Sequence, residues 1–596
     1  ADRAGAYVAA GSDVFTPGNL LDQDIYEVTD NVTFDVGASH RITVGTHNEF
    51  FSFFNGFFPR NQGVWTFADT TALKANAPNR YAIALPIREG GPNTDFSVQQ
   101  LGLYAQDAWS PNDRLTVTLG LRADVPFIDA PTQNPALLTS PLAINTSDFP
   151  SGNMLWSPRL GVNFDPDGRG TTILRGGVGL FSGRPPYVWI SNAFGNTGLE
   201  QVQLTCTASG SVPALTTDVN TLPTQCVGAT TGPTAPPADI NFFDPDFRFP
   251  QNLRVALGAD RRLPWGLVGT FDFLYSYAVN DLYIEEVNVN TVGTSAAEGG
   301  RTIYGTLSGS PTAFTATPSR VDPAFRQVLR HIGRSGAYTW SATGQLQKQF
   351  AGAVDVNAAY TYSRGKDYQS FTSSISASNF QFAPLFGTIG SRELQTSFFN
   401  VPHKLTLSGT VRIPVPLQPQ LSLIYLGRSG QPFSYQVSND INADGTAGND
   451  NMYVPTGATD ITLAGDPAAQ AVAFTRLDSL ITNTPCLNEQ RGRVMERTSC
   501  RNPWINTLNA RLAAFIPLPG QSLEISADFF NLLNLLDGGW GLEKRTSRFE
   551  TATLLRAAGF DAANGRPIYA LAFPRFEDPE LNLSRWRLQL GARYSF

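Results

Sequence analysis

Polar and apolar residues alternate with a period of two along many segments of this chain. The last twelve residues, RWRLQLGARYSF, show the alternation most clearly. A period of two places the two sets of side chains on opposite faces of a β-strand, whereas a helix would mix them around its axis. One face would carry Arg585, Arg587, Gln589 and Arg593. The other face would carry Trp586, Leu588, Leu590, Ala592, Tyr594 and Phe596.

The same alternation recurs at 115–123, 267–277, 354–362 and 405–413. These segments approach the ~9–11 residues that a tilted strand needs to cross a bilayer. The connections between them alternate between short and long. The short turns are rich in Pro, Gly and Asp and lie at 37–40, 110–113, 165–170, 263–266, 350–353, 414–419 and 517–521. The long polar segments lie at 54–95, 125–155, 183–250, 281–335, 365–402, 429–503 and 532–584.

Short turns on one rim and long loops on the other are typical of an outer-membrane β-barrel. A soluble β-propeller has no reason to keep that order. The sequence therefore predicts an all-β protein, a transmembrane antiparallel β-barrel with long extracellular loops. With residues 4–11 counted as one further strand, about sixteen strands are expected, with both ends of the chain on the short-turn rim. The stretch 209–237, rich in Thr, Pro, Ala and Gly, is predicted to be a mobile loop.

In a membrane barrel, the two faces of each strand lie in different environments. The apolar faces would contact lipid, while Arg122, Arg412, Arg587 and Arg593 would point into the lumen. Trp265 and Trp586 suit the aromatic belts at the membrane interfaces; the alternative is that they are ordinary β-core aromatics.

Composition supports the all-β reading. The chain contains 40 Phe, 18 Tyr, 54 Gly and 41 Pro residues, and only 16% of its residues are charged. This composition favours strands and turns. No run of about 18 apolar residues is present, so a transmembrane helix is not expected. The net charge of −7 provides no basic footprint, so nucleic acid is not expected as a partner.

The four cysteines form two pairs that are close in sequence, Cys206 with Cys226 and Cys486 with Cys500. Neither pair has His or Cys neighbours at zinc spacing. Two local disulfides in an oxidising compartment are predicted, each constraining the unfolded chain by roughly 3 kcal/mol.

Catalytic motifs are missing from the sequence. The histidines are His40, His47, His331 and His403, and none belongs to an HExxH motif. No GxxxxGK[ST] phosphate loop or GxSxG elbow is present, so an enzyme is not expected. His403 follows Pro402 at the start of a predicted strand and is interpreted as a residue of the barrel rim rather than a ligand.

One local motif predicts a cation site. The run DINADG starting at Asp440 has the D-x-N-x-D-G opening of a calcium loop, in which short oxygen ligands and a sharp Gly turn surround one hard cation. The candidate Ca²⁺ ligands are Asp440, Asn442, Asp444 and Thr446, the last through its carbonyl. The twelfth position is Asn451 in place of the usual Glu, next to Asp450. The alternative is a turn stabilised by its own side-chain hydrogen bonds.

Several motifs resemble the barrel of TonB-dependent outer-membrane receptors: YAQDAW at 104–109, RLTVTLGLRAD at 114–124, SPRLGV at 157–162, LRGGVGLFSGRPP at 174–186, DFFNLLN at 528–534 and the terminal Phe596. The Oar-like branch of that superfamily is the most similar, on HRITVGTHNEFF at 40–51, VPHKLTLSG at 401–409, DINADGTAGNDNMYVP at 440–455 and CRNPW at 500–504. Together these motifs span nearly the whole chain.

The resemblance implies an energy-coupled receptor in the outer membrane of a Gram-negative-type bacterium, with a barrel of about 22 strands and a plugged lumen. Residues 1–596 are then expected to be the C-terminal portion of the barrel, with a regulatory-like domain, the plug, the TonB box and about six strands upstream. The implied partners are membrane lipid, the barrel-assembly machinery, which would read the terminal strand ending at Phe596, TonB through the upstream part, and an unidentified ligand.

Two functions follow as hypotheses. The first is a TonB-dependent transporter, importing a substrate or exporting a protein in the manner of Oar. The second is a structural or adhesive protein whose disulfide-tied extracellular loops bind a surface partner.

Overall fold

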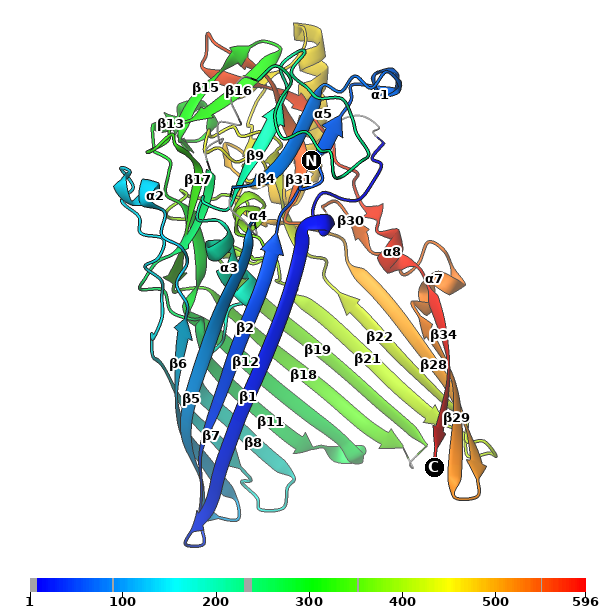
Figure 1. Cartoon of the computed structure of the whole chain (residues 1–596). Coiled ribbons are helices and arrows are strands. Elements are labelled where there is room, and N and C mark those ends of the chain that lie inside the picture. Colours follow the sequence, from blue (N-terminus) through cyan, green and yellow to red (C-terminus); the bar gives the residue numbers. More distant parts are fainter. Residues whose placement is uncertain (1–7, 88–90, 230–237, 351–352, 548) are drawn as a thin grey trace.

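One large, mostly antiparallel sheet dominates the chain (Figure 1). The computed structural model describes residues 8–87, 91–229, 238–350, 353–547 and 549–596. Within these residues the sheet has 18 strands. Three of them extend it on the loop side, namely β10 (Ala238–Phe243), β17 (Phe325–Arg334) and β20 (Gln395–Thr396), and the other fifteen form a curved wall.

The wall strands follow one another in chain order, each antiparallel to the next. They are β1 (Asn19–Val36), β2 (His40–Phe57), β5 (Asn93–Asn112), β6 (Leu115–Ile128), β7 (Leu155–Phe164), β8 (Thr172–Ser182), β11 (Gln251–Arg262), β12 (Leu267–Glu286), β18 (Tyr338–Phe350), β19 (Val354–Asp367), β21 (His403–Arg412), β22 (Gln420–Arg428), β28 (Ile505–Leu518), β29 (Gln521–Phe530) and β34 (Arg587–Ser595). The all-β antiparallel prediction is confirmed.

The alternation of short and long connections is also confirmed. All seven predicted short turns join consecutive wall strands at one rim, and the seven long segments join them at the other. Part of the turn at 350–353 lies outside the described residues. The turn between β11 and β12 is the 3-10 helix η2 (Pro264–Gly266), which contains Trp265 at a φ of 63°. The indole of Trp265 is 83% exposed at the short-turn rim, a position suited to an interfacial belt.

The prediction that the chain begins on the short-turn rim is wrong. The predicted first strand at 4–11 lies partly outside the described residues, and its described part, 8–11, forms no strand; the wall has fifteen strands among the described residues. Its first strand begins on the loop side, because Asn19 pairs with Phe57. Alanine and glycine at 9–11 have low strand propensity. Pro17, in the 3-10 helix η1 (Thr16–Gly18), has no N–H for a β ladder.

The terminal strand has the two faces that the sequence predicts. Leu588 lies opposite Phe529 and Tyr594 opposite Leu523, so the apolar residues of β34 and β29 share one face. Gln589 lies opposite Asp528 on the other face. Among the described residues, β1 pairs only with β2, and β34 only with β29; these two strands lie at the two ends of the sheet (Figure 1).

The long loops fold into a layer of small sheets and short helices above the wall (Figure 1). A five-stranded sheet contains β25 (Thr462–Leu463), β32 (Arg566–Leu571), β31 (Thr551–Asp561), β23 (Pro432–Val437) and β27 (Cys500–Arg501), in that order. A three-stranded sheet contains β3 (Val64–Thr66), β4 (Arg80–Pro86) and β9 (Gln201–Cys206). Four two-stranded sheets pair β13 (Gly293–Ser295) with β14 (Arg301–Ile303), β15 (Gly305–Ser310) with β16 (Ala313–Pro318), β24 (Tyr453–Val454) with β26 (Arg493–Val494), and β30 (Lys544–Arg545) with β33 (Asp578–Pro579). The helices are α1 (Thr70–Lys74), α2 (Pro135–Thr139), α3 (Tyr187–Gly195), α4 (Ser376–Gln381), α5 (Pro467–Asn483), α6 (Pro485–Asn488), α7 (Leu532–Leu536), α8 (Leu581–Ser584) and the 3-10 helix η3 (Ala296–Glu298). In the described part of the chain, no helix is long and apolar enough to span a membrane.

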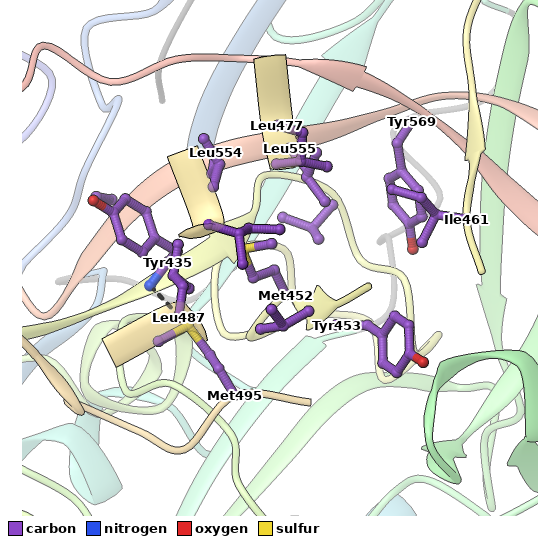
Figure 2. Close-up of a cluster of buried hydrophobic side chains, with 14 of the residues drawn as sticks. Tyr435, Met452, Tyr453, Ile461, Leu477, Leu487, Met495, Leu554, Leu555 and Tyr569 are labelled. Carbon is purple, nitrogen blue, oxygen red and sulfur yellow. Dashed lines mark hydrogen bonds between the residues drawn. The ribbon is translucent and has the colours of Figure 1, made fainter. Parts of the chain in front are cut away.

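The largest core of this layer joins the loop between β22 and β28 to the loop between β29 and β34. Figure 2 shows Tyr435, Met452, Leu477 and Leu555 among the side chains that pack together there. The backbone N–H of Tyr435 donates to the Met495 sulfur at 3.1 Å. Because residues more than one hundred positions apart share one core, these two loops fold as one body.

Candidate functional site

Arginine–carboxylate pairs run across the polar face of the wall. The pairs are Arg122 with Asp124 (2.7 Å), Arg175 with Asp260 (2.9 Å) and Asp272 (3.2 Å), Arg412 with Asp355 (2.7 Å), and Arg511 with Glu524 (2.5 Å) and Asp528 (3.1 Å). The Arg175, Arg412 and Arg511 side chains remain 43%, 48% and 44% exposed, so these pairs are solvated, whereas the Asp124 side chain is only 4% exposed. A charged, wet face opposite an apolar one is the lumen side of a membrane barrel.

Buried charges connect the long loops above this face. Arg497, 1% exposed, donates to Glu550 at 3.4 Å, to the Ser370 hydroxyl at 3.2 Å, and to Asp367. These three partners lie on two other loops, so one guanidinium connects three long loops. Burial raises the pKa of Glu550 to about 8, because a carboxylate with so little water around it is stabilised by protonation.

A second buried guanidinium has fewer partners. Arg392 is 1% exposed and donates from Nη1 to the Ala383 carbonyl at 2.9 Å. Its plane lies over the Phe380 ring at 5.3 Å. Nε and Nη2 are buried without a hydrogen-bond partner among the described residues. Burial lowers the pKa of Arg392. Neither Arg392 nor Arg497 stands in a sequence motif, so only the packing of distant loops reveals them.

The predicted calcium segment forms a tight, buried loop. Both Asp440 carboxylate oxygens accept backbone N–H groups, Oδ1 from Asp444 at 3.1 Å and Oδ2 from Gly445 at 2.9 Å. Gly445 has a φ of +91°, a conformation that glycine adopts readily. Asn442 accepts from the Asp444 N–H at 2.9 Å, and the Thr446 N–H donates to Asp444 at 2.7 Å. The structure therefore brings all four sequence-predicted ligands into one loop.

Burial raises the pKa of each carboxyl in this loop. The pKa of Asp440 rises to about 7, with the negative charge of Asp444 as a second cause. Burial also raises the pKa of Asp444, and that of Asp450 well above its usual value. Arg301 donates to Asp450 at 3.4 Å and partly offsets its burial. The three carboxylates therefore lie where a cation would stabilise their charged forms.

Glu27, His47 and Glu49 are the one His/Cys/Asp/Glu group in the described residues whose ligand atoms all lie within 4.8 Å of one another. Their charges already have partners, because Arg184 donates to Glu49 at 2.6 Å and the Thr29 hydroxyl contacts His47 Nδ1 at 2.8 Å. Glu27 is exposed.

Both predicted disulfides are present. Cys206–Cys226 has a Cα–Cα distance of 5.6 Å, and Cys486–Cys500 one of 5.2 Å. The first attaches the segment after β9 to the β3–β4–β9 sheet, where the Tyr81 hydroxyl also donates to the Pro223 carbonyl at 2.9 Å. These contacts anchor part of the predicted mobile loop; its residues 230–237 lie outside the described residues.

The histidines serve as packing and hydrogen-bonding groups. His403 begins β21 and contacts the Tyr360 hydroxyl at 2.7 Å, consistent with the predicted rim position. His331 is fully buried in the loop layer, stacked on Phe243 with ring centroids 4.5 Å apart. Its Nδ1 contacts the Phe242 carbonyl at 2.9 Å and its Nε2 the Ser376 hydroxyl at 2.8 Å.

The two-faced wall, its short turns and its folded loops define the class as a transmembrane β-barrel. Residues 5–537 match the outer membrane beta barrel domain family. The chain belongs to this family and is an outer-membrane protein. A comparison with curated proteins finds no match.

Solved structures similar to this chain are titled as outer-membrane transporters and receptors. The outer membrane transporter YddB from Escherichia coli is 12% identical, covering 96% of this chain and 54% of its own, with a TM-score of 0.46. The FrpB iron transporter from Neisseria meningitidis (F5-1 variant) is 8% identical, and the match covers 96% of this chain and 56% of the transporter chain, with a TM-score of 0.46. The siderophore receptor PirA from Acinetobacter baumannii is 12% identical, covering 85% and 50%, with a TM-score of 0.41. The chain spans about half the length of these structures.

Proposed function

We propose that the chain is the C-terminal barrel portion of a TonB-dependent outer-membrane receptor that moves an unidentified substrate across the outer membrane. The observation that carries the proposal is the charged face of the wall below a folded loop layer. Such a face provides a solvated path, and the loop layer provides a surface on which a ligand can be selected before it enters.

The two edges of the wall support the view that more strands complete the barrel. Backbone N–H and C=O groups at the outer edges of β1 and β34 would meet lipid, where an unpaired group costs several kcal/mol. We infer that upstream strands pair with these edges, and that an upstream plug and TonB box couple the barrel to inner-membrane energy. The motif resemblance at 104–186 and 401–504 supports the same assignment.

The experiment uses the full-length reading frame expressed in its own bacterium, with and without TonB. In-cell crosslinking between TonB and the receptor should yield a covalent complex that disappears when the TonB gene is deleted. Purified full-length receptor in liposomes should be impermeable to small sugars, as expected for a plugged lumen. Free sugar permeation without any TonB crosslink would contradict the proposal.

A second function, adhesion or structural anchoring, has one specific observation in its favour. The loop layer carries two disulfides and its own buried cores, which give it a fixed surface for a partner to bind. Whole cells that keep all growth phenotypes without TonB, yet lose attachment to a surface when the loop between β22 and β28 is shortened, would favour this function.

A further inference from the structure

The segment 440–451 places an unusual number of oxygen atoms in a small buried volume. We propose that it binds one Ca²⁺ ion, which joins the long loops to one another. The candidate ligands are the side chains of Asp440, Asn442, Asp444 and Asn449 and the carbonyl of Thr446. Alternating positions before a glycine turn let such oxygens converge on one ion.

Two buried amide oxygens point to a missing ligand. Asn449 and Asn451 are both 0% exposed, and the Oδ1 atom of each has no hydrogen-bond partner among the described residues. Asn449 Nδ2 donates to Asp444 Oδ2 at 2.9 Å, so this amide lies against the proposed ligand carboxylate. An unsatisfied buried acceptor costs about 1–3 kcal/mol. A bound cation would remove that cost for Asn449.

The charged groups around the segment favour binding of a cation. Five carboxylates interact here, those of Asp440, Asp444, Asp450, Glu286 and Glu298. Three guanidinium groups accompany them, those of Arg301, Arg320 and Arg392. Carboxylates therefore outnumber guanidinium groups around the segment, which favours a cation over an anion.

The donor set favours calcium over other cations. The candidate ligands are all oxygen atoms, and the segment contains no His or Cys, so zinc and copper have no preferred donor. Mg²⁺ keeps several waters and strict octahedral geometry, whereas Ca²⁺ accepts 6–8 protein oxygens in flexible geometry. The three Asp side chains are not gathered within 4.8 Å of one another, so amide and backbone oxygens would complete the coordination.

The position of the segment in the loop layer explains what the ion would do. Its backbone carbonyls accept hydrogen bonds from two other loops: Asn442 from the Tyr304 N–H at 2.8 Å, and Asn449 from the Leu385 N–H at 2.7 Å. Gln381 also donates to the Ala447 carbonyl at 3.0 Å. A cation that orders 440–451 therefore also orders the loops that follow β12 and β19.

The test uses the chelator-treated full-length protein in detergent, titrated with Ca²⁺ in a calorimeter. One saturable site is expected, with a dissociation constant no weaker than the order of 10⁻⁴ to 10⁻³ M of extracellular calcium modules. Tb³⁺ provides a second readout, because Tyr304 lies next to the site and can sensitise its luminescence. Ca²⁺ should quench that luminescence by displacing Tb³⁺.

Asp444→Asn keeps the size of the side chain and the bond from the Thr446 N–H, removes a charged ligand oxygen that also accepts from Asn442 and Asn449, and should weaken Ca²⁺ binding at least tenfold. The matched control is Asp460→Asn, in the same loop, whose carboxylate caps Thr456 at 2.7 Å and should leave binding unchanged. The absence of a saturable site in the unmodified protein, or equal effects of the two substitutions, would overturn the proposal. So would a thermal unfolding curve that EDTA does not shift.

Discussion

Arg497 donates to Glu550 at 3.4 Å across two loops that lie more than fifty residues apart in the chain. Both side chains are almost fully buried, 1% and 2% exposed. A buried ion pair adds little net stability, but removing one partner leaves the other charge desolvated and unpaired. The pair therefore makes the fold of each loop depend on the presence of the other.

Arg497→Met should destabilise the loop layer by about 3–5 kcal/mol, since Asp367 would lose its buried cation and Glu550, whose pKa is raised to about 8, would lose a hydrogen-bond donor. Hydrogen exchange of β23 and β31 should accelerate, while exchange of the wall strands should change little. The control is Arg575→Met: the Arg575 side chain is 87% exposed and pairs with Asp578 at 3.5 Å, a contact worth about 0–1 kcal/mol. Equal acceleration in both variants would contradict this account.

His331 should make the loop layer sensitive to acid. Burial lowers its pKa from 6.5 to about 4, so below pH 6.5 the unfolded state binds more protons than the folded state. The contribution of the neutral ring is present above pH 6.5 and is lost as the pH falls toward 4, by roughly 3 kcal/mol in total.

The measurement for His331 is chemical unfolding between pH 7 and pH 4.5 in the unmodified protein and in His331→Gln, which does not titrate. The difference in unfolding free energy between the two should change with pH in the stated direction. The other three histidines remain in both proteins and cancel in the comparison. A difference that stays constant over this range would refute the assignment.

The disulfide Cys486–Cys500 encloses a sequence separation of 14 residues. Replacing both cysteines with serine should cost about 3 kcal/mol, because the unfolded chain regains the entropy of the open loop. Limited proteolysis should then cut near α5 and α6 at lower protease concentration than in the unmodified protein. Unchanged cleavage in the double variant, with the protein still folded, would show that packing alone holds this loop.

The terminal residue should matter for assembly rather than for stability. Phe596 is 96% exposed at the end of β34, so Phe596→Ala removes little packing. We expect most of the folded protein to disappear from the outer-membrane fraction, because the motif resemblance implies that the barrel-assembly machinery reads the terminal strand. Phe549→Ala, at a 63% exposed loop aromatic, is the matched control and should assemble normally.

The alternation of apolar and polar residues, together with the Pro, Gly and Asp residues of the short turns, predicted the strands and turns of the wall from the sequence alone. The alternation of apolar and polar residues can be seen within one strand, without knowledge of its neighbours. Pro, Gly and Asp favour turns through their own backbone preferences. These signals located all seven short turns and the two faces of β34, and the spacing of the cysteines located both disulfide pairs. They failed at the described residues 8–11, where a short run of Ala and Gly after Val8 forms no strand.

The loop layer was decided only by tertiary structure. Its cores pair β23 with β31 and bring Arg497 to Glu550, contacts between residues that no local period relates. The motif at 440–451 was visible in the sequence, but the buried oxygens of Asn449 and Asn451 and the surrounding arginines appear only when three loops meet. Long polar loops carry weak local preferences, so their structure depends on burial that only the complete fold provides.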